Sequence, residues 1–181
     1  MRLFVAIEMP PEIRERITSY VSPLKPRLAN ARWVRSEGMH ITLKFLGNVA
    51  DEKRQAIEST LRKVRSRSFE LSLENVGMFP NARSPRVLWV GINSSPELAA
   101  LAAQVDLALA TLGFAREKRA FTPHVTLARF KEGGKKQHVS SVVGESDLSF
   151  GTMAATEFHL YESKPSPEGA RYSKLASFPL K

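Results

Sequence analysis

An internal repeat constrains the fold of this chain more than any other feature of its sequence. Three short patterns occur in the same order in both halves, at a nearly constant spacing. Matches in this order indicate a duplication. Two similar lobes related by a pseudo-two-fold axis would place their equivalent strands face to face across a cleft. The matching segments are 3–7 with 88–92, 11–13 with 96–98, and 40–43 with 124–127, at offsets of 85, 85 and 84 residues.

Each copy has the pattern of a strand, a helix and a further strand. We expect helices at about 11–22, 51–67 and 95–112, with Asp51 as an N-cap and Gly113 as a stop. Gly133-Gly134 with flanking lysines indicates a mobile loop. Alternating apolar residues predict strands at 2–8, 31–35, 39–46, 69–75, 86–92, 123–129, 147–152, 156–162 and 171–178.

The charge of the chain favours a polyanionic partner, RNA or DNA before a membrane. Lys and Arg number 27 against 18 Asp and Glu, which gives a formal net charge of +9. The basic residues gather at 53–54, at 62–67 and at 131, 135 and 136, and each cluster fits a nucleic-acid contact and a solvated surface equally well.

The sequence has no cysteine, which removes a thiol nucleophile, a zinc–thiolate site and a disulfide scaffold. It shows neither a long apolar run nor the pattern of a signal peptide. We therefore expect a cytoplasmic protein without membrane contact, and a monomer.

Two histidines occupy equivalent positions of the repeat. Because side chains alternate along a strand, His40 and Thr42 share one face, and so do His124 and Thr126. A lone histidine on a strand is more often structural than catalytic. Both of these, however, have Thr at +2 and Leu at +3. The pairing favours a functional site on the two strands.

The residue types around these histidines favour acid–base chemistry over metal binding. A catalytic zinc site usually has three protein ligands, and neither histidine has a second histidine or a carboxylate beside it. Two facing imidazoles can serve as base and acid on opposite sides of a phosphorus atom. The two threonine hydroxyls can donate to its non-bridging oxygens. The remaining histidines, His138 and His159, are interpreted as a solvent-exposed loop residue and as the polar side of a late strand.

The paired motifs resemble the HxTx motifs of the two-histidine (2H) phosphoesterases. The chain is most similar to the RNA 2′,3′-cyclic phosphodiesterases, once called 2′-5′ RNA ligases, and the resemblance covers nearly its whole length. The segments that carry it are 2–7 (RLFVAI), 40–47 (HITLKFLG), 86–91 (RVLWVG), 123–129 (PHVTLAR), 158–163 (FHLYES) and Tyr172.

The resemblance implies a bilobal α+β fold with an antiparallel sheet in each lobe and the motifs lining the cleft. The domain would span 1–181, with repeat copies at about 2–47 and 87–130. The implied reaction is hydrolysis of RNA 2′,3′-cyclic phosphodiester ends to 2′-phosphomonoesters, without a cofactor or a metal.

By position, the resemblance makes His40 the proton donor and His124 the proton acceptor. It also implies that Thr42, Thr126 and Arg129 bind phosphate and that Phe45 stacks on a base. Strict alternation would place Arg129 and Phe45 on the faces opposite the histidines. Either the strands bulge or end before them, or these two roles are wrong.

Three other functions remain open. The reverse reaction, 2′-5′ ligation, uses the same acid and base. No phosphate-binding Gly-rich loop is present, so such ligation would have to be independent of ATP. A small cyclic nucleotide could be the substrate. The third is a non-catalytic module that holds RNA ends. A pure binder needs only positive charge and stacking, whereas this chain has both histidines and both threonines.

Overall fold

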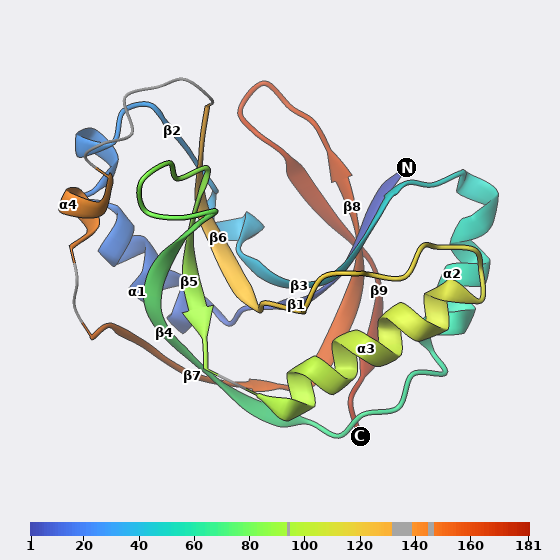
Figure 1. Ribbon diagram of the computed structural model, residues 1–181. Helices are drawn as coiled ribbons and strands as arrows, with labels where there is room; N and C mark the ends of the chain where they lie inside the picture. Colours follow the sequence, from blue (N-terminus) through green and yellow to red (C-terminus); the bar gives the residue numbers. More distant parts are fainter. Residues whose placement is uncertain (94, 132–138, 145–146) are drawn as a thin grey trace.

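The computed structural model describes residues 1–93, 95–131, 139–144 and 147–181, which form two antiparallel sheets. The sheets approach each other along β3 and β6 and separate toward the β8–β9 hairpin (Figure 1). Sheet I has the order β3-β1-β8-β9, and sheet II has the order β2-β6-β5-β4-β7. The strands are β1 (Arg2–Glu8), β2 (Ala31–Trp33), β3 (His40–Asn48), β4 (Phe69–Phe79), β5 (Val87–Ile92), β6 (His124–Phe130), β7 (Ser149–Ala155), β8 (Glu157–Lys164) and β9 (Arg171–Pro179).

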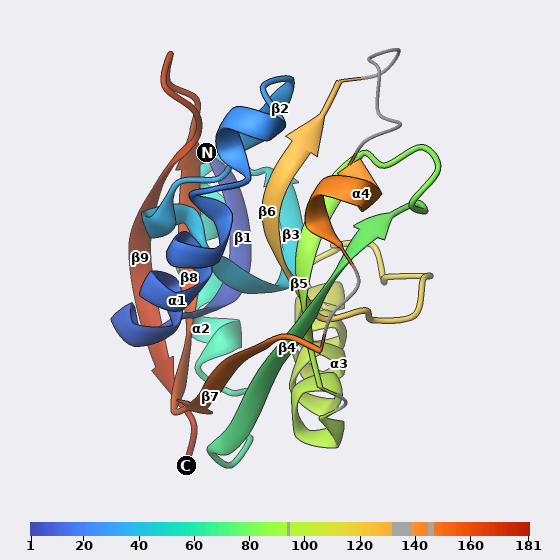
Figure 2. The ribbon, with the colours of Figure 1, turned by 90° about the vertical axis from the view of Figure 1, so that its left-hand side faces the viewer.

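Helices cover the outer faces of the two sheets. Helix α3 contacts β3 of sheet I and packs beside α2, whereas α1 contacts β7 of sheet II (Figure 2). The buried residues of α1 are Ile13, Ile17 and Val21, which form one apolar stripe at a spacing of four residues. None of the described helices has both the length and the hydropathy that a membrane span requires. The helices are α1 (Pro11–Val21), α2 (Arg54–Leu61), α3 (Pro96–Ala110) and α4 (Val139–Val143).

The two copies of the repeat exchange strands. The order β3-β1-β8 in sheet I recurs as β6-β5-β4 in sheet II. Adding the offset of 85 to β4 (69–79) gives residues 154–164, the region of β8. The third strand of each copy therefore completes the sheet built by the other copy. Because each sheet contains strands from both halves of the chain, the two motif strands are held in one continuous framework.

The second helix differs from its prediction. Residues 51–53 form a 3-10 turn and α2 ends at Leu61, well before Arg67. Asp51 makes no capping hydrogen bond, and its carboxylate lies 3.4 Å from the terminal amino group instead. Continuing the helix would place Arg62 and Arg65 three residues apart on one face, where like charges repel. Arg65 Nη1 instead donates to the Arg62 carbonyl at 2.8 Å.

The other expected elements are present within one to four residues of their predicted ends. Ser95 caps α3, because its Oγ accepts a hydrogen bond from the Leu98 N–H at 3.2 Å. Gly113 follows that helix with a φ of 87°, a conformation that favours glycine. Helix α4 was not expected, since five residues are too few to show helical periodicity. The loop at Gly133-Gly134 and His138 lie outside the described residues.

Candidate active site

A β-bulge in β3 sets the direction of the side chains that follow Thr42. Opposite β1, Thr42 pairs with Ala6 and Phe45 pairs with Phe4, so a step of three residues along β3 matches a step of only two along β1. One extra residue in β3 absorbs the difference. Phe45 therefore returns to the face that carries His40 and Thr42, against strict alternation.

The second motif has the same bulge at the equivalent position. On β5, Trp89 pairs with Thr126 and Val87 pairs with Arg129, so β6 also contains one extra residue. Arg129 thus shares the face of His124 and Thr126. Of the alternatives left by the sequence, the structure selects the bulged strands.

One cleft of about 880 Å³ contains all six residues that the sequence singled out. Its two walls are the facing surfaces of sheets I and II, where β3 and β6 contact each other. Within the described residues, neither threonine hydroxyl has a hydrogen-bond partner, which leaves both available to a bound ligand. The six residues are His40, Thr42, Phe45, His124, Thr126 and Arg129.

Aromatic rings enclose His40. Its imidazole stacks on Phe4 with ring centroids 4.7 Å apart and on Tyr161 at 5.9 Å, and the edge of Tyr172 lies at 5.1 Å. Burial among these rings lowers the pKa of His40 to about 4, although a hydrogen bond with the backbone of Gly38 acts in the opposite direction. In the free protein, this imidazole is neutral at neutral pH.

His124 has a different environment. The edge of Phe79 lies 5.1 Å from its ring, and Trp89 lies 6.5 Å away. Its Nδ1 is 2.8 Å from the Thr122 carbonyl oxygen, an atom that can only accept a hydrogen bond. The proton of a neutral imidazole is therefore held on Nδ1, and Nε2 is left with a free lone pair. A general base needs this tautomer.

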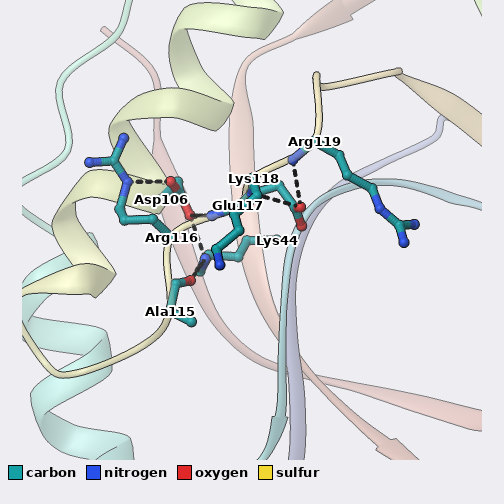
Figure 3. A network of polar contacts seen from close by, with 7 residues as sticks. All are labelled: Lys44, Asp106, Ala115, Arg116, Glu117, Lys118 and Arg119. Atoms are coloured by element: carbon teal, nitrogen blue, oxygen red, sulfur yellow. Dashed lines mark hydrogen bonds and ion pairs between the residues drawn. The ribbon is translucent and has the colours of Figure 1, made fainter.

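A buried ion pair joins the first motif strand, β3, to helix α3 (Figure 3). The bulge turns Lys44 into the interior, where its Nζ bonds to the Asp106 carboxylate of α3 and to the Ala115 carbonyl at 2.8 Å. Asp106 also accepts hydrogen bonds from Arg116 Nε at 2.6 Å and from the Glu117 N–H at 3.1 Å. The network connects β3 to the segment that leads into β6.

The Asp106 carboxylate is held in its charged form. Burial alone would raise its pKa, but the hydrogen bonds from Lys44, Arg116 and the Glu117 backbone outweigh burial and lower it to about 2. The Glu117 carboxylate accepts hydrogen bonds from the backbone N–H groups of Lys118 and Arg119, each at 3.0 Å, and so holds the chain that follows it (Figure 3).

His159 is buried rather than exposed on the polar side of a strand. It is 1% exposed, and its Nδ1 lies 2.9 Å from Ser177 Oγ. It lies opposite Ala6 in the β1–β8 ladder and does not line the cleft. Burial lowers its pKa. Because its ring has a hydrogen-bond partner in the interior, we interpret it as a structural histidine.

Three arginines of the cleft, Arg2, Arg32 and Arg35, were not predicted. Arg2 and Phe4 are two residues apart on β1, and both line the cleft. Placing Phe4 there from the sequence would have placed Arg2 as well. The clusters at 53–54 and 62–67 do not line the cleft, which supports the solvated-surface interpretation for them. Lys135 and Lys136 lie outside the described residues. Among the described residues, no group of three or more His, Cys, Asp or Glu side chains could hold a metal ion.

Comparisons with known proteins agree with this architecture. The profile of the family described as LigT like Phosphoesterase matches the chain twice, over residues 7–89 and 90–172. The crystal structure of E. coli LigT complexed with 3′-AMP superposes with a TM-score of 0.82 at 33% identity, covering 99% of this chain and 97% of that one. The predicted α+β class, with two duplicated lobes and antiparallel sheets, is confirmed.

Relatives with assigned names match over the full length. The RNA 2′,3′-cyclic phosphodiesterase of Archaeoglobus fulgidus is 40% identical over 179 residues, 98% of this chain and 99% of that protein. The protein of the same name from Escherichia coli is 34% identical over 181 residues, 99% and 96% of the two chains. The chain belongs to the LigT-like phosphoesterase family.

Proposed function

We propose that this protein hydrolyses 2′,3′-cyclic phosphodiester ends of RNA to 2′-phosphomonoesters. The observation that carries the proposal is the matched pair of imidazoles and hydroxyls that two bulged strands present to one cleft. The names of the full-length relatives support the same substrate class.

The reaction needs one proton accepted and one donated. His124 Nε2 takes a proton from water while the water oxygen attacks phosphorus. The bond from phosphorus to the 3′ oxygen breaks, and His40 donates a proton to that oxygen. Thr42, Thr126 and Arg129 bind the non-bridging oxygens, on which the negative charge is held. Each histidine contributes about 10²–10⁴ to the rate.

The donor role of His40 depends on the substrate. Burial keeps its imidazole neutral in the free protein, with a pKa of about 4. The negative charge of a cyclic phosphate beside the ring favours the protonated form and raises this pKa. His40 therefore gains its proton together with the substrate, and the aromatic rings prevent a proton from being held there in its absence.

Phe45 has the exposure that a stacking platform needs. Its side chain is 65% exposed at the cleft, an unusual position for a large apolar ring. A terminal base that stacks on it would gain about 1–3 kcal/mol.

We further propose that the protein is cytoplasmic and acts as a monomer. The lack of cysteines led us to expect the cytoplasmic compartment.

The test is turnover of a 2′,3′-cyclic mononucleotide by the purified protein, followed by phosphorus NMR. We expect a 2′-phosphomonoester as the product, and unchanged turnover in excess EDTA. A 3′ product, or activity that a chelator abolishes and one divalent ion restores, would contradict the mechanism. Joining of a 2′,3′-cyclic phosphate end to a 5′-hydroxyl end without ATP would instead support ligation.

A further inference from the structure

The cleft extends beyond the histidines and threonines along charged residues that the proposed reaction does not use. One side of this extension consists of Arg32 and Arg35, before and after the end of β2. The other side is the tip of the β8–β9 hairpin, residues 166–170 (Figure 1). A single bound phosphate does not fill a cleft of about 880 Å³.

Arg32 and Arg129 face each other across the β2–β6 ladder. Both side chains are exposed at the cleft, and neither has an acidic partner within the described residues. Like charges directly opposite in a sheet repel. With Arg129 bound to the reacting phosphate, Arg32 is left to bind a second anion. The planar guanidinium binds two oxygens of one phosphate at once, which makes a phosphate the matching ligand.

Arg35 forms an ion pair across the rim of the cleft. Its Nη1 lies 3.0 Å from Glu168 Oε2, and Arg171 Nη2 lies 3.5 Å from the same oxygen. A tight turn presents Glu168, because Ser166 and Gly169 exchange backbone hydrogen bonds of 3.1 and 3.0 Å. The Arg35 and Glu168 side chains are 49% and 64% exposed, and such pairs contribute only about 0–1 kcal/mol.

The Glu168 carboxylate is bound to Arg35, whose guanidinium is otherwise suited to a phosphate. When the cyclic phosphate of an RNA end lies between the histidines, the next negative charge along the chain is the internucleotide phosphate. Charge-assisted hydrogen bonds to a phosphate are stronger than an exposed ion pair. The incoming phosphate can therefore replace Glu168 at Arg35.

We propose that Arg32 and Arg35 bind the internucleotide phosphate that precedes the terminal nucleotide, and that Glu168 competes with it. This inference rests on the proposed function and adds a preference to it: RNA ends are better substrates than cyclic mononucleotides. The preference resides in two arginines outside both HxTx motifs and is moderated by one carboxylate of the hairpin.

The test compares two substrates, a 2′,3′-cyclic mononucleotide and a dinucleotide that ends in a 2′,3′-cyclic phosphate. For each protein the measured quantity is the ratio of kcat/KM for the dinucleotide to kcat/KM for the mononucleotide. Arg35→Gln should lower this ratio about tenfold, the effect of one charged hydrogen bond. Glu168→Gln should raise it about threefold, because a weak competitor is lost. Arg67→Gln, an exposed arginine away from the cleft, is the matched control and should leave the ratio unchanged.

The outcomes separate the two proposals. If the wild-type protein turns over neither substrate, the proposed function is wrong. If it turns over both, but Arg35→Gln lowers the two values equally, the second phosphate site is rejected and the proposed function stands. A ratio that falls in Glu168→Gln would also overturn the inference, because Glu168 would then support the substrate rather than compete with it.

Discussion

The two copies of the HxTx motif have the same backbone and different surroundings. In both, one extra residue in the strand brings the position five residues after the histidine back to the cleft face. That position is Phe45 in one copy and Arg129 in the other. His40 is enclosed by Phe4, Tyr161 and Tyr172, whereas His124 meets the edge of Phe79 and the Thr122 carbonyl.

The difference shows how a duplicated strand can acquire two roles. The bulge and the His-x-Thr spacing fix the positions of the imidazole and the hydroxyl. The neighbouring strands β1, β8 and β9 then supply the rings that lower the pKa of His40 to about 4. Different surroundings on the same backbone give the two imidazoles different environments for a proton, and those of His40 favour its neutral form in the free protein.

Loss of either imidazole should have the largest effect on activity. His40→Ala and His124→Ala should each lower kcat by about 10²–10⁴ on a cyclic mononucleotide. Both side chains line the cleft, so thermal melting should show folded proteins, although His40→Ala leaves a gap among the three rings around it. Near wild-type turnover in either variant, or a loss explained by unfolding, would refute the two-histidine mechanism.

A leaving group that needs no proton should then separate the two roles. A pH profile cannot do so, because a coupled pair reports pKa values of the pair and not of either residue. A substrate with sulfur at the 3′ bridging position should restore His40→Ala by about 10², most of what an acid contributes, and His124→Ala far less. Rescue of the His124 variant instead would reverse the assignment.

The stability of the protein at acid pH tests the burial of His40. The pKa of His40 is about 4 in the folded protein, below its ordinary value of 6.5. Between these pH values this residue binds more protons in the unfolded chain than in the folded one. The contribution of the neutral imidazole to the free energy of unfolding is therefore complete above pH 6.5 and is lost as pH falls to 4. It amounts to at most about 3 kcal/mol. Urea unfolding of wild type and His40→Gln at pH 7 and 4.5 should show a smaller pH effect in the variant. Equal pH effects would contradict the burial of this imidazole.

Much of this framework follows from the sequence because it depends on short-range periodicity. The alternation in 40–43 and 124–127 places each histidine with its threonine, and the repeat predicts two related sheets. The bulges have no such signal, since neither Leu43 nor Leu127 is a residue that marks one. The rings around His40 come from three strands far apart in sequence. The burial of Lys44 follows from the bulge and was missed for the same reason.

The smallest expected effect concerns the ion pair that connects the copies. Only the first copy has a charged residue, Lys44, at the position that the bulge turns inward, and the equivalent residue is Ala128. A buried ion pair adds little to stability, and replacing one partner alone is costly, about 3–5 kcal/mol. The informative variant therefore replaces both partners, as Lys44→Met with Asp106→Leu.

This double variant should remain folded, because apolar residues of similar volume often replace a buried ion pair without loss of stability. It should also lose the bonds that hold the segment 115–117 against β3 and α3. We expect kcat to fall about tenfold, since small displacements of a catalytic group are costly, with little change in KM. The matched control removes a partly buried ion pair of α2 away from the cleft, as Arg54→Gln with Glu58→Gln, and should keep its kcat. A stable double variant with wild-type kcat would show that the pair fills the interior without positioning His124, and that the two copies are aligned by their sheets alone.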